Sequence, residues 1–194
     1  MIETEIEFKN LITSDQFKQI RDSLFIDITP FYQTNFYIDT EDLQIRKNIL
    51  MLRIRELEDR FVLTLKVPNE VHVITEYHQI LDESVIEKTN IDESDLGADI
   101  INVLKERNID TNTLKIQGQL ETIRYERTYK NGLLVLDESR YFGETDYELE
   151  YEAKNVSDGK VVFNEILDHY DIQRTEEVVK SERFYKKLVE RKDG

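Results

Sequence analysis

Charged residues alternate with apolar residues near the N-terminus of this sequence. Glu5, Glu7 and Lys9 are separated by Ile6 and Phe8. Because successive side chains of a β-strand point to opposite faces, this spacing places two carboxylates and an amine together on one face. Carboxylates can bind a divalent cation, and lysine can bind an anion. The stretch is therefore either an edge strand with a solvated charged face or one wall of an ionic site.

The same alternation recurs along the chain with both signs of charge. The acidic residues at such positions are Glu76, Asp137, Glu148 and Glu150, and the basic residues are Arg53, Arg55, Lys66 and Arg124. Carboxylate oxygens suit Mg²⁺ or Mn²⁺, whereas arginine offers paired donors for phosphate oxygens. The inventory predicts a hard-cation site next to a polyanion site.

Strands and helices must position these side chains. The patterns predict strands at 2–9, 32–40, 50–57, 61–67, 71–81, 114–130, 133–138 and 147–152, helices at 14–25 and 161–170, and a terminal segment at 180–192. A short turn or helix is expected at 41–48, and hairpin turns are expected at 58–59 and 131–132. The acidic segment 82–112 predicts one or two helices and is the best candidate for a divide between two halves.

The apolar strand faces require cover, which the helices can supply. If helices pack on the outside of a closed antiparallel sheet, the charged faces line the inside of a barrel. Burying so many charges without a ligand would cost several kcal/mol for each uncompensated ion. We therefore expect an α+β fold, mainly β, whose charged barrel interior is wet, internally paired or filled by ligand, and the inventory of charges favours a ligand.

Composition limits the class of protein. A chain of 194 residues with 39% hydrophobic residues is large enough for a single domain over residues 1–194. A net charge of −15 argues against a partner that is a nucleic acid polymer or a membrane surface. The absence of cysteine excludes disulfides, thiolate metal sites and a cysteine nucleophile. With no signal peptide and no apolar run of ~20 residues, we expect a soluble cytoplasmic protein.

With these residues placed, the sequence resembles the CYTH superfamily, the triphosphate tunnel metalloenzymes, and within it the YjbK-like proteins of Gram-positive bacteria. Glu5, Glu7 and Lys9 match the family's ExExK signature. The later positions follow in the family's order: Arg53, Arg55, Lys66, Glu76, Arg124, Asp137, Glu148, Glu150 and the C-terminal Lys180-Ser-Glu-Arg183-Phe. The resemblance implies an eight-stranded antiparallel β-barrel tunnel, with helices outside, that binds triphosphate compounds together with a divalent metal ion.

The charge inventory and the resemblance together give a hypothesis of metal-dependent triphosphate hydrolysis, in which Mg²⁺ or Mn²⁺ is the cofactor. The expected metal ligands are Glu5, Glu7, Asp137, Glu148 and Glu150. The expected substrate-binding residues are Lys9, Arg53, Arg55, Lys66, Arg124 and Lys180. The expected catalytic residues are Glu5, Glu7, Lys9 and Glu76. The expected partner is a small-molecule triphosphate such as inorganic tripolyphosphate or thiamine triphosphate, bound by a monomer or homodimer.

Two other functions remain open at this stage. A binding module would bind a nucleotide or polyphosphate without turnover, and a class IV adenylate cyclase would release pyrophosphate from ATP. Nothing in the sequence identifies a pocket that reads a base. His72, His78 and His169 lack the spacing of metal ligands, and only His78 lies near a candidate carboxylate, Glu76.

Overall fold

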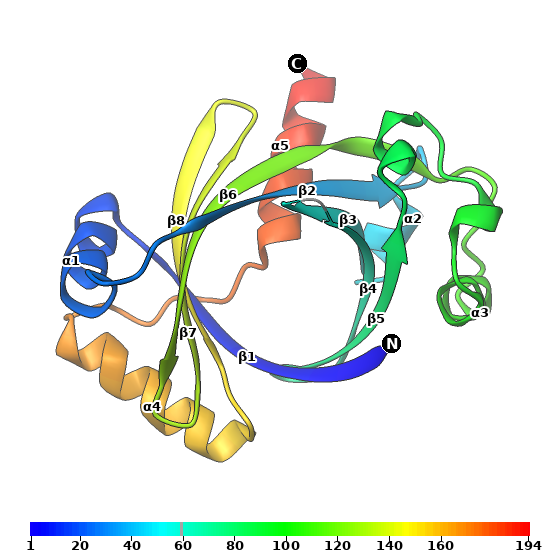
Figure 1. The fold of residues 1–194 in the computed structure, drawn as a ribbon. Coiled ribbons are helices and arrows are strands. Elements are labelled where there is room, and N and C mark those ends of the chain that lie inside the picture. The colour runs from blue at the N-terminus through cyan, green and yellow to red at the C-terminus, as the bar shows by residue number, and fades with distance from the viewer. Residues whose placement is uncertain (59) are drawn as a thin grey trace. The chain divides into compact units, whose positions relative to one another are not determined.

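The computed structural model describes residues 1–58 and 60–194, so Asp59, half of the turn predicted at 58–59, lies outside the described residues. The strands labelled in Figure 1 are β1 (Ile2–Ile12), β2 (Phe31–Asp39), β3 (Met51–Leu57), β4 (Arg60–Glu70), β5 (Val73–Leu81), β6 (Lys115–Tyr129), β7 (Gly132–Tyr141) and β8 (Glu144–Glu152). The helices are α1 (Ser14–Leu24), α2 (Gln44–Lys47), α3 (Ala98–Glu106), α4 (Val156–His169) and α5 (Lys180–Asp193). Two 3-10 turns, η1 (Glu83–Glu87) and η2 (Glu93–Asp95), precede α3.

The strands form a closed antiparallel barrel in the order β1-β5-β4-β3-β2-β6-β7-β8. The predicted fold class is thereby confirmed. The chain divides into two compact units: unit 1 is Met1–Thr4 with Gln33–Leu120, and unit 2 is Glu5–Tyr32 with Glu121–Gly194. The single domain over residues 1–194 stays a prediction.

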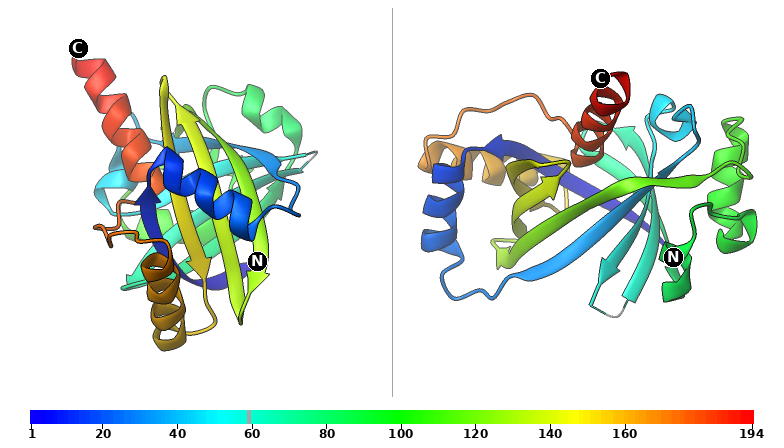
Figure 2. Two further views of the ribbon diagram at one scale, coloured as in Figure 1. Left: turned by 90° about the vertical axis from the view of Figure 1, so that its left-hand side faces the viewer. Right: turned by 90° about the horizontal axis from the view of Figure 1, so that it is seen from above.

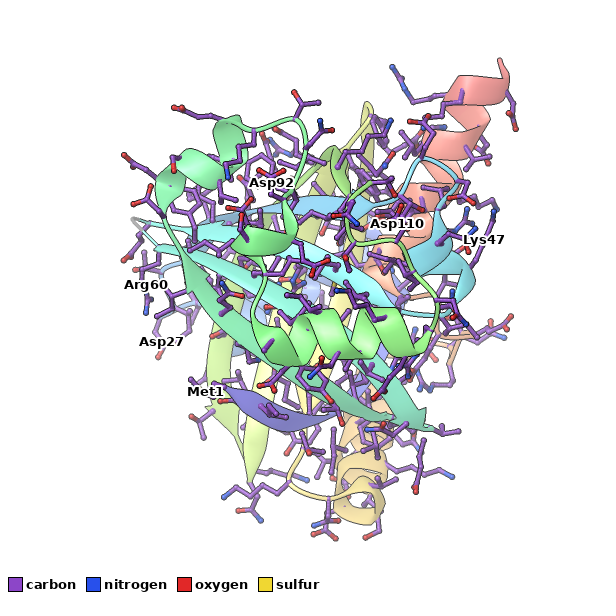
Figure 3. The ribbon with its side chains drawn as sticks, turned by 90° about the vertical axis from the view of Figure 1, so that its right-hand side faces the viewer. Met1, Asp27, Lys47, Arg60, Asp92 and Asp110 are labelled. Atoms are coloured by element: carbon purple, nitrogen blue, oxygen red, sulfur yellow. The ribbon has the colours of Figure 1, made fainter. Side chains whose placement is uncertain are left out.

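In unit 1, α3 covers the apolar face of the sheet. Leu52 of β3 and Leu63 and Leu65 of β4 are buried in one hydrophobic cluster with Ile100 and Leu104 of α3. Figure 3 views unit 1 from the side on which α3 lies across these strands. Since strand residues alternate between faces, the residues between these leucines form a second, polar face that α3 does not cover.

In unit 2, α1 and α4 cover the apolar face of the sheet. Phe8 of β1, Leu136 of β7 and Leu149 of β8 are buried in one cluster with Phe17 of α1 and Phe163 of α4. Figures 1 and 2 show both helices on the same side of β7 and β8. The charged residues that alternate with these apolar residues therefore lie on the opposite face of the sheet.

Thr13 and Gln16 form a capping box at the start of α1, which lies within the predicted helix at 14–25. The Thr13 side chain accepts a hydrogen bond from the backbone of Gln16, and the Gln16 side chain accepts one from the backbone of Thr13. The helix predicted at 161–170 instead begins at Val156, because Asn155 caps the backbone N–H of Asp158. A Cβ at Gly159 would lie 2.5 Å from a ring carbon of Phe8, so glycine permits α4 to pack this closely.

The hairpin between β6 and β7 is present, but its turn is displaced by one residue from the prediction. Tyr129 pairs with Gly132, so Lys130 and Asn131 form the connection. Gly132 is needed for a different reason, since a Cβ there would lie 2.3 Å from the backbone oxygen of Glu152. Glycine at this position therefore allows β8 to approach closely rather than making the turn itself.

The segment 82–112 contains one α-helix and two 3-10 turns, in line with the predicted one or two helices. The predicted divide between two halves at this segment is wrong, because all of it belongs to unit 1. Val85, Leu96 and Ile109 are buried in the same hydrophobic cluster as the sheet leucines, which ties the segment to unit 1. None of the helices within residues 1–58 and 60–194 has the length and apolar content needed to cross a membrane.

Candidate active site

Three carboxylates from β7 and β8 lie together on one face of unit 2. Asp137 is directly opposite Glu148 in the antiparallel register, and Glu150 follows two residues later on the same face. One oxygen atom from each lies within 4.8 Å of the others. The three residues, termed here the carboxylate cluster, are 0%, 1% and 5% exposed. Carboxylates buried so close together require compensating cations.

Arg124 and Lys180 supply positive charge to the carboxylate cluster. Arg124 donates from Nε to Asp137 Oδ1 at 2.8 Å and from NH2 to Asp137 Oδ2 at 2.7 Å, and NH2 also donates to Glu150 at 3.2 Å. Lys180, the first residue of α5, donates to Asp137, and its Nζ lies 3.3 Å from Glu148 and 3.4 Å from Glu150. A single ammonium group therefore contacts all three carboxylates.

Arg183 fixes the orientation of Glu148 from the same turn of α5. Its NH1 donates to Glu148 Oε2 at 2.8 Å, while its Nε and NH2 donate to Asp146 at 2.9 and 3.2 Å. Asp146 also accepts a hydrogen bond of 2.8 Å from the Tyr141 hydroxyl. The other oxygen of Glu148, Oε1, is buried and lies 3.3 Å from Lys180 Nζ, an ion pair without hydrogen-bond geometry.

Lys9 joins β1 to the same face. It is opposite Glu150 in the register of β1 and β8, and its Nζ lies 2.6 Å from Glu7 Oε1. Burial alone would lower the pKa of Lys9, but the carboxylates of Glu7, Glu150 and Glu148 raise it above its ordinary value. Glu5, two residues before Glu7, is half-buried.

The electrostatics of the carboxylate cluster are uneven. Burial raises the pKa of Glu148 to about 7. Burial also opposes ionisation of Glu150 and Asp137, but Lys180 and Arg124 outweigh it and hold both of these pKa values below their ordinary range. Asp137 and Glu150 are therefore anionic at neutral pH. A further positive charge near Glu148 would lower the pKa of its carboxyl group and favour its ionised form.

The polar face of unit 1 carries a second ionic network. Arg53, Thr64 and His78 are neighbours in the registers of β3, β4 and β5, and Lys66 is opposite Glu76. Lys66 Nζ lies 2.6 Å from Glu76 Oε1, and His78 Nε2 lies 2.9 Å from Glu76 Oε2. His78 Nδ1 and the Thr64 hydroxyl are 3.0 Å apart. An amine and an imidazole therefore hold the Glu76 carboxylate between them.

Arg55 lies on this face as well, opposite Asn35 of β2. Its Nε donates to Asn35 Oδ1 at 3.0 Å. Arg53, Arg55 and Lys66 thus place three cations on this face. Arginine and lysine are the residues that bind phosphate oxygens.

The family follows from comparison with known proteins. A family model described as CYTH domain matches residues 3–185. The chain belongs to the CYTH family. The CYTH match spans all the strands described above except Ile2 of β1, and it includes the turn of α5 that carries Lys180 and Arg183.

Known relatives of this CYTH chain extend over nearly its whole length. It is 35% identical over 184 residues to "Putative triphosphatase YjbK" of Bacillus subtilis (strain 168). The aligned region covers 94% of this chain and 95% of the relative. The crystal structure of a "putative adenylate cyclase" from Bacillus halodurans is 34% identical, with a TM-score of 0.85, and covers 95% of this chain and 98% of that one. The structure of a "putative adenylyl cyclase" from Hippeastrum, reported with a dominant triphosphatase activity, is 21% identical and has a TM-score of 0.76. The match covers 95% of this chain and 96% of the Hippeastrum chain, and at this identity it supports the fold alone.

The carboxylate cluster of the CYTH protein suits a divalent metal ion. Its donors are all carboxylate oxygens, the ligands that Mg²⁺ and Mn²⁺ prefer. The ammonium of Lys180 contacts all three carboxylates, so the cluster already accommodates a positive charge among its oxygens. The carboxylate cluster found within residues 1–58 and 60–194 does not include Glu5 or Glu7. Their assignment as metal ligands stays a prediction.

Most of the residues predicted from the sequence are brought together within one unit or the other. Unit 2 assembles Lys9, Arg124, Asp137, Glu148, Glu150 and Lys180, and unit 1 assembles Arg53, Arg55, Lys66 and Glu76. Sequence reasoning gave no role to Arg183, Thr64 or Asn35. The signal for Arg183 was its position three residues after Lys180, which places both on one face of a helix.

Proposed function

We propose that this CYTH protein hydrolyses the terminal phosphoryl group of a triphosphate compound, of the class of inorganic tripolyphosphate or thiamine triphosphate. The observation that carries the proposal is the buried carboxylate cluster with Arg124 and Lys180 bound to it. The name of the Bacillus subtilis relative supports the same reaction class. The proposed setting is the cytoplasm, with the protein a monomer or homodimer.

The residues proposed to hold the metal ion are the carboxylate cluster with Glu5 and Glu7. Mg²⁺ or Mn²⁺ bound there supplies positive charge against the phosphate oxygens. The proposed phosphate-binding residues are Arg53, Arg55 and Lys66 in unit 1 and Lys9, Arg124 and Lys180 in unit 2. Their charges neutralise oxygens that become more negative as the terminal bond breaks.

Glu76 or one of the metal-binding carboxylates is proposed to orient the attacking water. The water oxygen bonds to the terminal phosphorus, the bond from that phosphorus to the bridging oxygen breaks, and the water proton passes to that carboxylate. Tripolyphosphate would yield phosphate and pyrophosphate. Phosphoryl transfer depends on positioning and charge neutralisation, so the reaction needs no serine or cysteine nucleophile.

A second candidate function follows from the name of the Bacillus halodurans structure. A cyclase would convert ATP to a cyclic nucleotide and pyrophosphate without releasing phosphate. A binding module would bind the triphosphate and release neither product.

Product analysis separates these functions. The protein is incubated with Mg²⁺ or Mn²⁺ and, in turn, tripolyphosphate, thiamine triphosphate and ATP. Phosphate released from tripolyphosphate or thiamine triphosphate, and lost in a Glu5→Ala/Glu7→Ala variant, supports hydrolysis. Cyclic nucleotide from ATP would support the cyclase, and binding without any product would support the binding module. Equal phosphate release by the variant and the unaltered protein would refute the proposed site.

A further inference from the structure

Three hydrogen-bond donors on β2 and β3 are buried without an acceptor. They are Gln33 Nε2, Asn35 Nδ2 and Arg53 Nε, which have no hydrogen-bond partner within residues 1–58 and 60–194. Gln33 is 3% exposed and Asn35 is 0% exposed. Because a buried donor without an acceptor costs free energy, such atoms are rare in native proteins unless a ligand or water satisfies them.

The three donors belong to one face of unit 1. Asn35 is opposite Arg55, and the next pair on the same face is Tyr37 opposite Arg53. Gln33 lies two residues before Asn35 and therefore shares its face, about 7 Å further along the strand. The donors thus form a row beside the phosphate-binding cations proposed above.

The orientation of the Asn35 amide follows from its neighbour. Arg55 Nε donates to Asn35 Oδ1 at 3.0 Å, and a guanidinium group has no acceptor. The oxygen of the amide must therefore face Arg55. This leaves Nδ2 as the donor that lacks an acceptor among the described residues, and the Arg55 contact fixes that orientation of the amide.

We propose that Gln33 and Asn35 are further substrate-binding residues, whose amides donate uncharged hydrogen bonds to phosphate oxygens beside Arg53. This inference rests on the proposed function and extends its substrate site to β2. The three unsatisfied atoms are all donors, and fully ionised phosphate oxygens are acceptors only. Uncharged donors add hydrogen bonds without further like-charge repulsion among Arg53, Arg55 and Lys66. The row therefore selects a ligand whose oxygens are acceptors at more than one position.

Isosteric changes from amide to acid test this assignment directly. Asn35→Asp keeps an oxygen for Arg55 and replaces the unsatisfied donor by a negatively charged acceptor. Gln33→Glu makes the same change two residues away, and Gln33→Met removes the donor without adding charge. Gln19→Glu, on the exposed surface of α1, is the control with the same change in net charge.

The measurement is calorimetric binding of tripolyphosphate to the full chain in EDTA, so that no turnover occurs. Hydrogen bonds to charged groups predict a dissociation constant at least about 10-fold higher for Asn35→Asp and Gln33→Glu, and several-fold higher for Gln33→Met. The control should remain within about 2-fold of the unaltered protein. If Asn35→Asp fails to fold, as judged by thermal unfolding, the two Gln33 variants decide the result.

The outcome separates this inference from the proposed hydrolysis. Unchanged affinity in the Gln33 and Asn35 variants would overturn the inference and assign the donors to water, even if the protein hydrolyses triphosphates. Failure of the unaltered protein to bind tripolyphosphate would overturn it as well. Weaker binding by the variants supports the inference even if metal-loaded protein releases no phosphate, in which case the proposed hydrolysis alone fails.

Discussion

Arg124 and Asp137 face each other across β6 and β7 and share two hydrogen bonds, of 2.8 and 2.7 Å. Asp137 is 0% exposed and also accepts a hydrogen bond from Lys180. The planar guanidinium matches the two carboxylate oxygens, which is the geometry of a strong charge-assisted pair. This pair anchors β6 to the carboxylate cluster.

Removing one member of the pair should be costly for stability. Arg124→Met leaves the buried Asp137 with one cation fewer, and we expect the free energy of unfolding to fall by about 3 kcal/mol. The double variant Arg124→Met/Asp137→Leu should recover part of this loss, because it removes the uncompensated charge. Urea denaturation of Arg124→Met, Asp137→Leu and the double variant measures the coupling free energy between Arg124 and Asp137. A loss below about 1 kcal/mol in Arg124→Met would contradict the prediction.

Glu150→Gln should weaken metal binding. The change keeps the size of the side chain but removes one anionic ligand from the carboxylate cluster, so the dissociation constant for Mn²⁺ should rise by about 10-fold or more. Titration calorimetry without substrate gives this value directly. Glu176→Gln, at an exposed position between α4 and α5, is the control with the same charge change. Equal Mn²⁺ affinities for the two variants would argue against a metal site at the cluster.

Lys180→Met should have the opposite effect on the metal. The ammonium of Lys180 contacts all three carboxylates and competes with a divalent ion for their oxygens, so its removal should tighten Mn²⁺ binding by about 10-fold, or ~1.4 kcal/mol. The KM for tripolyphosphate should rise at the same time, because a phosphate-binding cation is lost. Lys186→Met, exposed on the same helix, loses the same charge and should change neither value. Weaker Mn²⁺ binding in Lys180→Met would show that the lysine supports the metal site instead.

Tyr141 should make stability depend on pH in the alkaline range. Burial, and then the hydrogen bond to Asp146, raise the pKa of Tyr141 above its ordinary value of 10.0. Since the folded protein retains this proton more tightly than the unfolded chain does, the stabilisation is complete below about pH 10 and is lost as pH rises further. Urea denaturation at pH 8 and pH 11 should show a smaller fall in stability for Tyr141→Phe than for the unaltered protein. Tyr32→Phe, at a position 71% exposed, should behave like the unaltered protein.

Much of the site could be predicted from strands in which charged and apolar residues alternate. The two faces of a strand have different surroundings, so each face has its own residue types. The spacing of Glu148 and Glu150 on a strand fixes a shared face, and the register then brings Asp137 opposite Glu148. The same reasoning placed Arg53 and Arg55 together. Local patterns of this kind need no knowledge of distant contacts.

Other parts of the site could not be read from local patterns. The contact of Lys180 with Asp137 joins residues 43 positions apart and depends on how α5 packs. Asn35 looks like an ordinary polar strand residue in the sequence, and only the structure shows that its Nδ2 has no hydrogen-bond partner among residues 1–58 and 60–194. The early start of α4 was hidden because Gly159 weakens the helical signal, although close packing on Phe8 requires a glycine there.

Lys180 and Arg183 reach the carboxylates from a single turn of α5, so the rotational phase of this helix governs both contacts at once. Inserting one residue just before Lys180 would rotate the following helix by about 100° relative to the preceding segment. Both cations would then turn away from β7 and β8 together, whereas an insertion after Leu188 would leave them in place. The number of residues that precede Lys180 therefore matters to the site as much as their types do, whereas the length of the helix beyond Leu188 does not.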